Sequence, residues 1–234
     1  MALVVLAPMR PPMRSFAKEI IMLKTLAPTL VGQLREVSFP TLGHFLETGF
    51  TDHRLRALVP NVRMIGRAVT LKLAQPDAIA VNRALANLVA GDVLVIDMCG
   101  DHAHAPVGAV TVTAALHAGA AGIVVDGVVT DILELREARL PVFARGTSML
   151  TTKRLDAGTA EFDVPVECGG VVVEPGALVL GDDNGVLFAH AASLADVIGA
   201  ALESDRAEPG VLARLRAGEA ASEVLHGVER SKTR

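Results

Sequence analysis

The stretch from Val107 to Ser148 constrains the fold most, because helix-like and strand-like segments alternate within it. A helix is expected over residues 108–117. Gly119 and Gly122 follow it and end the helical pattern. The apolar β-branched run Ile123–Val125 predicts a short buried strand that ends at Asp126-Gly127. A second helix is expected from Thr130-Asp131, and Val142–Ala144 begins the next strand. This alternation predicts an α/β fold in which two helix starts face one pocket.

The first interpretation of Asp131 is structural. Asp131 precedes Glu134 by three residues, which is the spacing of a capping box at a helix start. An aspartate at this position accepts hydrogen bonds from the first free N–H groups of its own helix. The spacing therefore predicts that Asp131 caps the helix that follows it.

The rest of the chain continues the mixed pattern. Helices are expected over residues 15–34, interrupted at Pro28, and over 40–49, 76–88, 193–205 and 209–225. Strands are expected over residues 67–73, 93–96, 160–166, 171–173, 178–180 and 186–188, with a hairpin turn at Asp182–Gly185. Because strands outnumber helices in the last third, we expect a mixed sheet with helices on both faces.

The length and hydrophobic content set the domain organisation. The chain has 234 residues, of which 51% are hydrophobic, which is enough for one sizeable core. The short apolar run Leu3–Leu6 meets three prolines at once and lacks a preceding basic region, so it does not resemble a signal peptide. We therefore expect a flexible leader over residues 1–14 and a single domain with N- and C-terminal helices over residues 15–234.

Several classes of protein are disfavoured. The net charge of -4, without a long basic run, gives no reason to expect a nucleic-acid partner. No run of 18 apolar residues predicts a membrane span. Cys99 and Cys168 lie far apart in apolar surroundings, which favours two buried reduced thiols and a cytoplasmic protein. The phosphate-binding G-x-x-x-x-G-K, the dinucleotide-binding G-x-G-x-x-G after a strand, and the zinc-binding H-E-x-x-H motifs are absent.

Four motifs together resemble the RraA-like family in order and spacing. They are the G-x-x-G at Gly119–Gly122, the D-G-x-V-x-D at Asp126–Asp131, the P-V-F-A-x-G at Pro141–Gly146 and the V-x-P-G-x-x-V-x-G-D-x-x-G-V at Val173–Val186. The resemblance covers roughly Pro40 to Leu225. It implies a β/β/α swivelling-domain type of fold with a mixed sheet, and a ring-shaped homotrimer that is sometimes doubled to a hexamer.

The resemblance also implies two kinds of function. The family includes metal-dependent aldolases that cleave 4-hydroxy-4-methyl-2-oxoglutarate or 4-carboxy-4-hydroxy-2-oxoadipate into pyruvate and a second oxo acid, with oxaloacetate decarboxylation as a side activity. It also includes a non-catalytic regulator of RNase E. For this chain we expect a divergent metal-dependent lyase acting on a small 2-oxo acid. The alternative is a non-catalytic ring protein that binds and regulates a partner protein.

The aldolase pattern is only partly present. The aldolases share an acidic residue, twenty intervening residues, and then Arg-Asp, which places the acid at Ala109, the arginine at Thr130 and the aspartate at Asp131. The resemblance therefore implies that Asp131 is the remaining ligand of Mg²⁺ or Mn²⁺, and this interpretation competes with the capping role. Residues Gly108–Thr111 (Gly108, Ala109, Val110 and Thr111) and Thr130 would line the substrate carboxylate, with the backbone N–H groups of the helix start replacing the lost arginine in part.

A second candidate group lies just upstream of this helix start. The segment Asp101-His102-Ala103-His104 follows the strand predicted over residues 93–96. Open α/β sheets bind their ligands at the carboxyl ends of strands, and imidazole and carboxylate groups can move protons or hold metals. We therefore consider Asp101 and His104 as catalytic groups that replace the acid missing at position 109. A solvated polar loop is the alternative.

Overall fold

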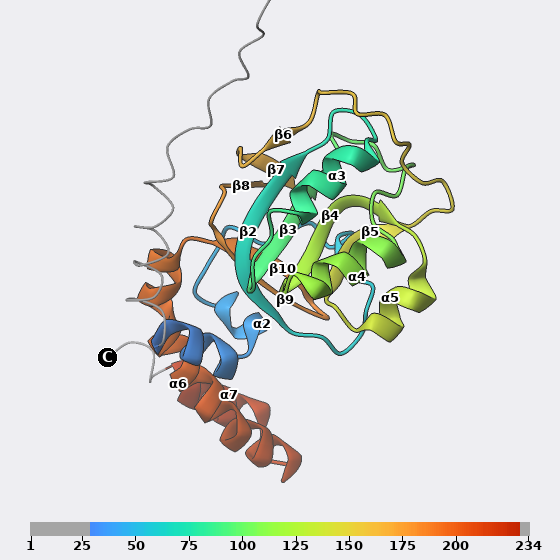
Figure 1. The fold of residues 1–234 in the computed structure, drawn as a ribbon. Coiled ribbons are helices and arrows are strands. Elements are labelled where there is room, and N and C mark those ends of the chain that lie inside the picture. The colour runs from blue at the N-terminus through green and yellow to red at the C-terminus, as the bar shows by residue number, and fades with distance from the viewer. Residues whose placement is uncertain (1–28, 230–234) are drawn as a thin grey trace, which may run out of the picture.

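The computed structural model describes residues 29–229 of the chain (Figure 1). Residues 29–36 form a helix. The helices that follow are α2 (Phe39–Leu42), α3 (Ala78–Leu85), α4 (Ala109–His117), α5 (Ile132–Ala138), α6 (Ala191–Arg216) and α7 (Ala221–Glu229). The strands are β1 (Arg56–Ala57), β2 (Met64–Lys72), β3 (Asp92–Asp97), β4 (Gly122–Val129), β5 (Val142–Thr147), β6 (Glu161–Phe162), β7 (Val166–Cys168), β8 (Val171–Val173), β9 (Leu178–Asp182) and β10 (Gly185–Ala189).

One mixed sheet organises the molecule. Its strand order is β1-β5-β4-β3-β2-β9-β10, and β6 pairs with the end of β2. Strands β2 to β5 are parallel and are joined by the crossover helices α3, α4 and α5, whereas β1, β9 and β10 run antiparallel to their neighbours. The predicted α/β class with a mixed sheet is confirmed. Because the four parallel strands point the same way, their carboxyl ends meet at one edge of the sheet.

The sheet curls until its two end strands, β1 and β10, come into contact, so that it is nearly barrel-like. The inner face is filled by apolar side chains, and the small antiparallel sheet β7–β8 closes it. The main contributors are Val95, Val124 and Phe143 from the large sheet, with Val166 and Cys168 from β7. This second β layer gives the β/β/α arrangement of layers.

The helices lie on the outer face of the curled sheet in two groups. Helices α3, α4 and α5 cover β2 to β5, and α2 and α6 cover β9 and β10 (Figure 1). Ile65 packs against the second group and Leu71 belongs to the first. The two residues are separated by an even number of positions in β2, and alternate residues of a strand share one face. The two helix groups therefore share a single face of the sheet. The prediction that helices cover both faces was wrong, because the small sheet β7–β8 packs on the other face.

The alternation predicted within Val107–Ser148 is confirmed, with one correction. The strand predicted to end at Asp126-Gly127 continues to Val129, because β4 contains a bulge between Val125 and Val128. A β-carbon at Gly127 would lie 2.8 Å from Cγ of Met98, so glycine here allows the loop after β3 to pack on the strand. The turn signal in the sequence therefore marks a bulge within a strand.

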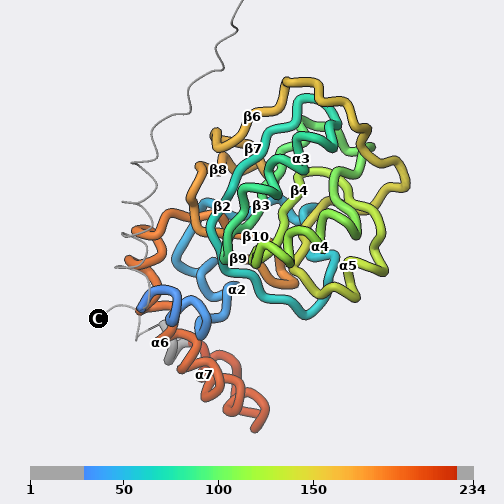
Figure 2. Tube along the Cα trace, in the orientation of Figure 1, coloured from blue at the N-terminus to red at the C-terminus, as the bar shows by residue number. Residues whose placement is uncertain are grey.

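The predicted ends of the helices over 40–49 and in the C-terminal region were wrong. The helix predicted over residues 40–49 ends at Leu42, and Gly49 lies instead against the carbonyl of Phe188, where its φ of 90° is accessible to glycine. The helix predicted over 193–205 continues through Pro209 to Arg216 as α6. The helix predicted over 209–225 is divided, because its last residues belong to α7. Pro209 is exposed, and Asp205, whose carbonyl loses its helical donor at this proline, is only partly buried. Figure 2 shows α6 beside the N-terminal helices, where its first half packs.

The cysteine prediction holds for one residue of the two. Cys168 is buried, but Cys99 is exposed and has a positive φ of 50° directly after β3. Within residues 29–229, no helix is long and apolar enough to cross a membrane. The predicted leader over residues 1–14 and most of the predicted first helix lie outside the described residues, and the single domain over 15–234 stays a prediction.

Candidate functional site

The starts of α4 and α5 meet at the carboxyl edge of the parallel strands, as the sequence predicted. The backbone N–H of Ala109 donates to Oδ2 of Asp131 at 2.9 Å, and the N–H of Thr130 donates to the carbonyl of Val107 at 2.9 Å. Gly108 is the N-cap residue of α4 and Asp131 is the N-cap residue of α5. The predicted substrate-binding residues and Asp131 are therefore brought together by two direct hydrogen bonds.

The capping role predicted for Asp131 within its own helix was wrong. Its side chain makes no capping hydrogen bond to α5, and its backbone lies in the left-handed region at φ 55° and ψ 45°. The carboxylate points instead to the start of α4, and the Thr130 hydroxyl donates to its Oδ1 at 3.2 Å. A non-glycine residue in this conformation costs about 1–3 kcal/mol, and such residues cluster at functional sites.

Gly108 makes this close approach possible. A β-carbon at position 108 would lie 2.5 Å from Oδ2 of Asp131 and 2.8 Å from Cγ2 of Thr130. The backbone of Gly108 is extended, at φ -146° and ψ -163°, so the requirement for glycine is one of space. Gly108 therefore allows the Asp131 carboxylate to reach the N-terminus of α4.

The first turn of α4 offers free donors beside this carboxylate. The first intrahelical hydrogen bond runs from the Val112 N–H to the Gly108 carbonyl at 3.0 Å. The N–H groups of Val110 and Thr111 precede that bond and have no acceptor within the helix. Such groups and the helix dipole attract anions. α4 carries no acidic residue in its own first turn, and the carboxylate of Asp131 takes only the Ala109 N–H. A carboxylate group of a ligand can therefore bind at this turn.

The residues present are compatible with a divalent cation that is held by one carboxylate of the chain, that of Asp131. In the described part of the chain, no three His, Cys, Asp or Glu side chains gather in a group that could hold a metal. Mg²⁺ is commonly bound through one or two carboxylates, with water and substrate oxygens completing its octahedron. Asp131 is exposed, and none of the ion pairs among residues 29–225 involves it. Asp131 can therefore supply one ligand to a cation whose other ligands come from outside the chain.

Asp101 and His104 form a pair, as their spacing allowed. Oδ2 of Asp101 lies 2.7 Å from Nδ1 of His104, and Oδ1 accepts the N–H groups of Ala103 and His104 at 2.8 and 3.1 Å. Burial opposes ionisation of Asp101, but these N–H groups and the imidazole outweigh it and lower the pKa of Asp101 below its usual value. His102 is exposed and does not join the pair. The segment therefore holds a dyad, and it does not form the metal cluster that three ionisable residues suggested.

One charged cluster was missed in the sequence. Arg145 on β5 pairs with Asp126 on β4 and lies 3.5 Å from Asp52, and all three side chains are largely buried. The hydrogen bond to Asp126 raises the pKa of the Arg145 guanidinium. Asp126 also accepts the N–H of Gly169 at 2.9 Å, and this hydrogen bond connects the turn between β7 and β8 to β4. The sequence signal that could have revealed this cluster was a charged residue within each of the apolar runs that form β4 and β5.

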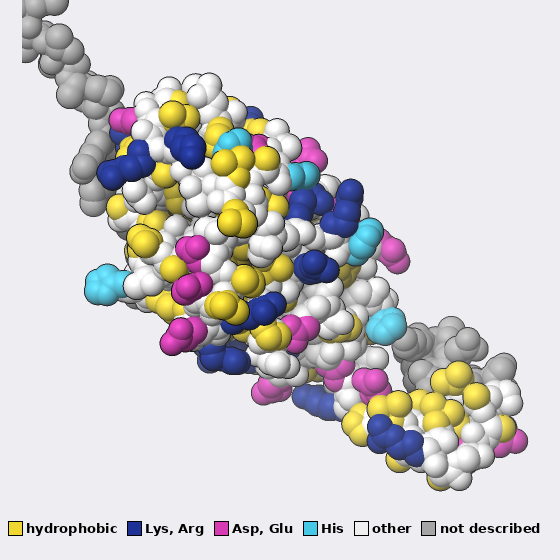
Figure 3. Space-filling view, turned by 90° about the vertical axis from the view of Figure 1, so that its right-hand side faces the viewer, with side chains coloured by type: hydrophobic (Ala, Val, Ile, Leu, Met, Phe, Trp, Pro, Cys, Tyr) yellow, Lys and Arg dark blue, Asp and Glu magenta, His cyan; other side chains and the backbone are white. Residues whose placement is uncertain are grey.

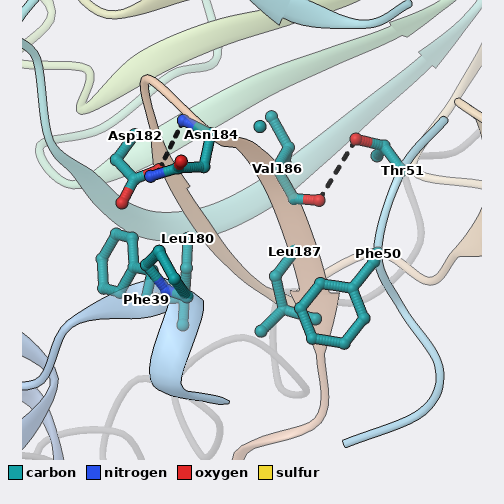
Figure 4. A pocket seen from close by; sticks show the side chains of 10 residues that line it. Phe39, Phe50, Thr51, Leu180, Asp182, Asn184, Val186 and Leu187 are labelled. Carbon is teal, nitrogen blue, oxygen red and sulfur yellow. Dashed lines mark hydrogen bonds between the residues drawn. The ribbon is translucent and has the colours of Figure 1, made fainter. Parts of the chain in front are cut away.

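A small cleft lies elsewhere on the molecule, beside the β9–β10 hairpin (Figure 4). It has a volume of about 110 Å³ and is lined mainly by apolar side chains, including Phe39, Phe50, Leu180 and Leu187. Asp182 and Asn184 stand at its rim and bond to each other. None of the predicted site residues lines this cleft, and its single acid offers little for catalysis.

Comparison with known proteins gives a family match over more than half of the chain. The model of the RraA-like family, described as Aldolase/RraA, matches residues 39–188. This range contains β1 to β9, all but the last residue of β10, and the helix starts that carry Gly108 and Asp131.

Three relatives illustrate the similarity in sequence. A protein of Halalkalibacterium halodurans, named provisionally as a 4-hydroxy-4-methyl-2-oxoglutarate aldolase, is 38% identical over 132 residues, which are 56% of this chain and 62% of that protein. A 4-hydroxy-4-methyl-2-oxoglutarate aldolase of Thermus thermophilus is 36% identical over 126 residues, which are 54% of this chain and 75% of that protein. An uncharacterised protein of Methanocaldococcus jannaschii is 27% identical over 216 residues and covers 88% of this chain and 98% of its own length.

Solved structures show the same fold. An uncharacterised protein of Pseudomonas syringae superposes with a TM-score of 0.73 at 21% identity, covering 86% of this chain and 95% of that chain. Streptomyces coelicolor RraAS2, described as an unusual member of the RNase ES inhibitor RraA family, superposes with a TM-score of 0.67 at 28% identity, covering 78% and 94%. The RNA-processing inhibitor RraA of Thermus thermophilus gives a TM-score of 0.59 at 30% identity, covering 66% and 93%.

Proposed function

This chain belongs to the RraA-like family, and on that premise we propose that it is a divergent metal-dependent lyase acting on a small 2-oxo acid. The proposed reaction is retro-aldol cleavage of a 4-hydroxy-2-oxo acid to give pyruvate, or decarboxylation of oxaloacetate. The aldolase names of sequence relatives support the reaction class. We also propose that the protein works in the cytoplasm.

One observation carries the proposal, which is the position of the Asp131 carboxylate at the N-terminus of α4. Oδ2 of Asp131 accepts the Ala109 N–H at 2.9 Å, and the free N–H groups of the same helical turn lie beside it. A 2-oxo acid presents a carboxylate next to a polarisable carbonyl, so it needs an anion-binding group and a cation-binding group side by side. In the proposed site, the junction of α4 and α5 would supply both.

The residues at the junction of α4 and α5 have different roles in the proposed binding of cation and substrate. Asp131 would hold the cation, and the N–H groups of Val110 and Thr111 would bind the substrate carboxylate. Gly108 keeps the two groups adjacent, and the Thr130 hydroxyl fixes the second oxygen of Asp131. When bound, a divalent cation acts as a Lewis acid that draws electrons from the 2-oxo group.

Two losses from the aldolase pattern predict a slow enzyme. Thr130 cannot form the bidentate hydrogen bonds that an arginine makes to a carboxylate. Charge-assisted hydrogen bonds contribute about 1.5–3 kcal/mol, so their loss weakens carboxylate binding by about 10- to 150-fold. Ala109 has no group that can move a proton. Weak activity, or a changed substrate, is therefore expected.

We further propose that the protein assembles as a homotrimer or hexamer. Three large apolar side chains stand exposed on elements next to the site, and their exposed fractions are 84% for Val110, 72% for Leu133 and 98% for Met149. Figure 3 views the side of the molecule that carries α4 and α5, and it shows apolar side chains at the surface between charged ones. Light scattering tests the assembly, and a monomer at micromolar concentration would refute it.

Steady-state kinetics tests the proposed function. Wild-type protein with Mg²⁺ or Mn²⁺ should cleave 4-hydroxy-4-methyl-2-oxoglutarate or decarboxylate oxaloacetate slowly, above the rate of the cation alone. Asp131→Asn should remove this activity, because an amide is a poorer ligand for a hard cation. A wild type with no activity on either substrate would contradict the lyase proposal and leave the non-catalytic ring protein as the better account.

A further inference from the structure

The dyad of Asp101 and His104 has no function in the binding steps described above. The ionised Asp101 carboxylate can only accept hydrogen bonds, so Nδ1 of His104 must donate across the 2.7 Å that separates it from Oδ2. The basic nitrogen of the neutral ring is then Nε2. Among residues 29–225, Nε2 of His104 makes no hydrogen bond. The ring therefore has Nδ1 bonded to Asp101 and Nε2 without a hydrogen-bond partner among these residues.

The dyad is held rigidly on the loop between β3 and α4. Asp101 binds its own loop through Oδ1, and its N–H donates to the Met98 carbonyl at 3.0 Å. Its carbonyl packs on β4, where a β-carbon at Gly127 would lie 3.2 Å away. Directly after the dyad, the N–H of Ala105 donates to the Leu150 carbonyl at 2.8 Å. The His104 ring, whose side chain is 29% exposed, is therefore fixed and partly open to solvent.

The same loop places the dyad at the edge that carries Asp131. Val107 bonds directly to Thr130, the neighbour of Asp131, and His104 precedes Val107 by three residues. Three residues of extended chain span at most about 11 Å, so the backbone of His104 lies within that distance of Val107. Figure 1 shows α4 and α5 side by side at this edge. The dyad therefore lies on the loop that ends at the start of α4, three residues before the residue that binds Thr130.

We propose that His104 is the proton-transfer residue of this site and that Asp101 is its positioning residue. This inference rests on the proposed lyase function. The resemblance to the aldolases places an acidic group at position 109, where this chain has Ala109. A lyase with this sequence needs a basic group from elsewhere, and the Asp101–His104 dyad supplies one at the same edge of the sheet.

The proton and electron balance of retro-aldol cleavage suits one such base. Nε2 of His104 takes the proton of the C4 hydroxyl, and the O–H electron pair becomes the new carbonyl bond of the leaving oxo acid. The C3–C4 bond breaks, and its electron pair forms the enolate of pyruvate. The proton held on Nε2 then returns to C3 and gives pyruvate. No oxidant, reductant or co-reactant is consumed, and the base ends in its starting state.

Exchange of the methyl protons of pyruvate in D₂O, followed by NMR with Mg²⁺ present, tests this step without cleavage. His104→Gln should lower the exchange rate and the turnover number by about 100-fold or more, which is the usual contribution of a general base. Affinity for Mn²⁺ should stay unchanged. His102→Gln is the matched control, because His102 is an exposed histidine on the same loop, and it should retain the wild-type rate.

Two further variants separate catalysis from folding. Free imidazole should restore part of the exchange in His104→Ala. Asp101→Asn should lower the turnover number with little change in KM, because the amide turns the ring to the wrong tautomer. Wild-type activity that persists in His104→Gln would overturn the inference and leave the lyase function standing. Loss of Mn²⁺ affinity in the same variant would also overturn it. A wild type with neither exchange nor cleavage would overturn the lyase function itself.

Discussion

Replacement of Gly108 by alanine should detach Asp131 from the start of α4. The added β-carbon would lie 2.5 Å from Oδ2 of Asp131 and 2.8 Å from Cγ2 of Thr130. Both neighbours are ends of side chains, so the backbone can stay in place while the carboxylate turns away. The Ala109 N–H then loses its charged acceptor. Such a bond contributes about 1.5 kcal/mol at an exposed position, which corresponds to a fall in Tm of about 3–6 °C.

The larger effect of Gly108→Ala should be on the cation, because the displaced carboxylate no longer lies beside the α4 N–H groups. We expect Mn²⁺ affinity in the presence of pyruvate to fall at least about tenfold, which corresponds to about 1.4 kcal/mol. Calorimetry and thermal unfolding measure the two effects on one sample. Gly146→Ala is the control, since a β-carbon there meets no atom within 4 Å. If Gly108→Ala binds Mn²⁺ and unfolds like the wild type, Gly108 does not position Asp131.

Two further predictions concern the missing catalytic groups and the buried carboxylate that begins α3. Thr130→Arg combined with Ala109→Asp should raise turnover with Mg²⁺ by more than the product of the two single effects, because the two groups act on one bound substrate; equal or lower activity in the double variant would argue against the aldolase pattern. Asp77→Ala should lower the free energy of unfolding by about 2–3 kcal/mol, because the buried Asp77 carboxylate accepts four backbone hydrogen bonds. Their donors are the N–H groups of Ile79, Ala80, Asp156 and Ala157. Burial opposes ionisation of Asp77, but these four bonds lower its pKa, so its contribution is complete above the unfolded-chain pKa and declines as the pH falls below it. Denaturant unfolding across acidic pH tests this, and a wild type and Asp77→Ala that lose stability in parallel would refute it.

The sequence predicted the central alternation because its signals are local. Apolar β-branched runs and glycine positions define β3, β4 and the start of α4, and the hairpin at Asp182–Gly185 was predicted and is present in β9–β10. Local signals failed where a tertiary contact decides the outcome. Asp131 has the spacing of a cap for its own helix, but its carboxylate binds the neighbouring helix.

Long-range partners account for the other errors. Gly49 looked like the end of a helix, but it allows the chain to approach Phe188, which is 139 residues away in the sequence. Arg145 and Asp126 lie on adjacent strands and meet Asp52 from a distant loop, so no spacing rule joins them. The Asp101–His104 pair was predictable because its two residues are close neighbours in the chain.

Calorimetric titration of Mn²⁺ into the protein, with oxalate present as a mimic of the pyruvate enolate, tests the central claim most directly. Wild-type protein should bind the cation weakly and only with oxalate, because in the proposed site a single carboxylate, that of Asp131, would hold it. Asp131→Asn keeps an oxygen that can accept the Ala109 N–H, so the fold should persist while binding is lost. Equal affinity in the wild type and Asp131→Asn, or no binding by the wild type, would contradict the account.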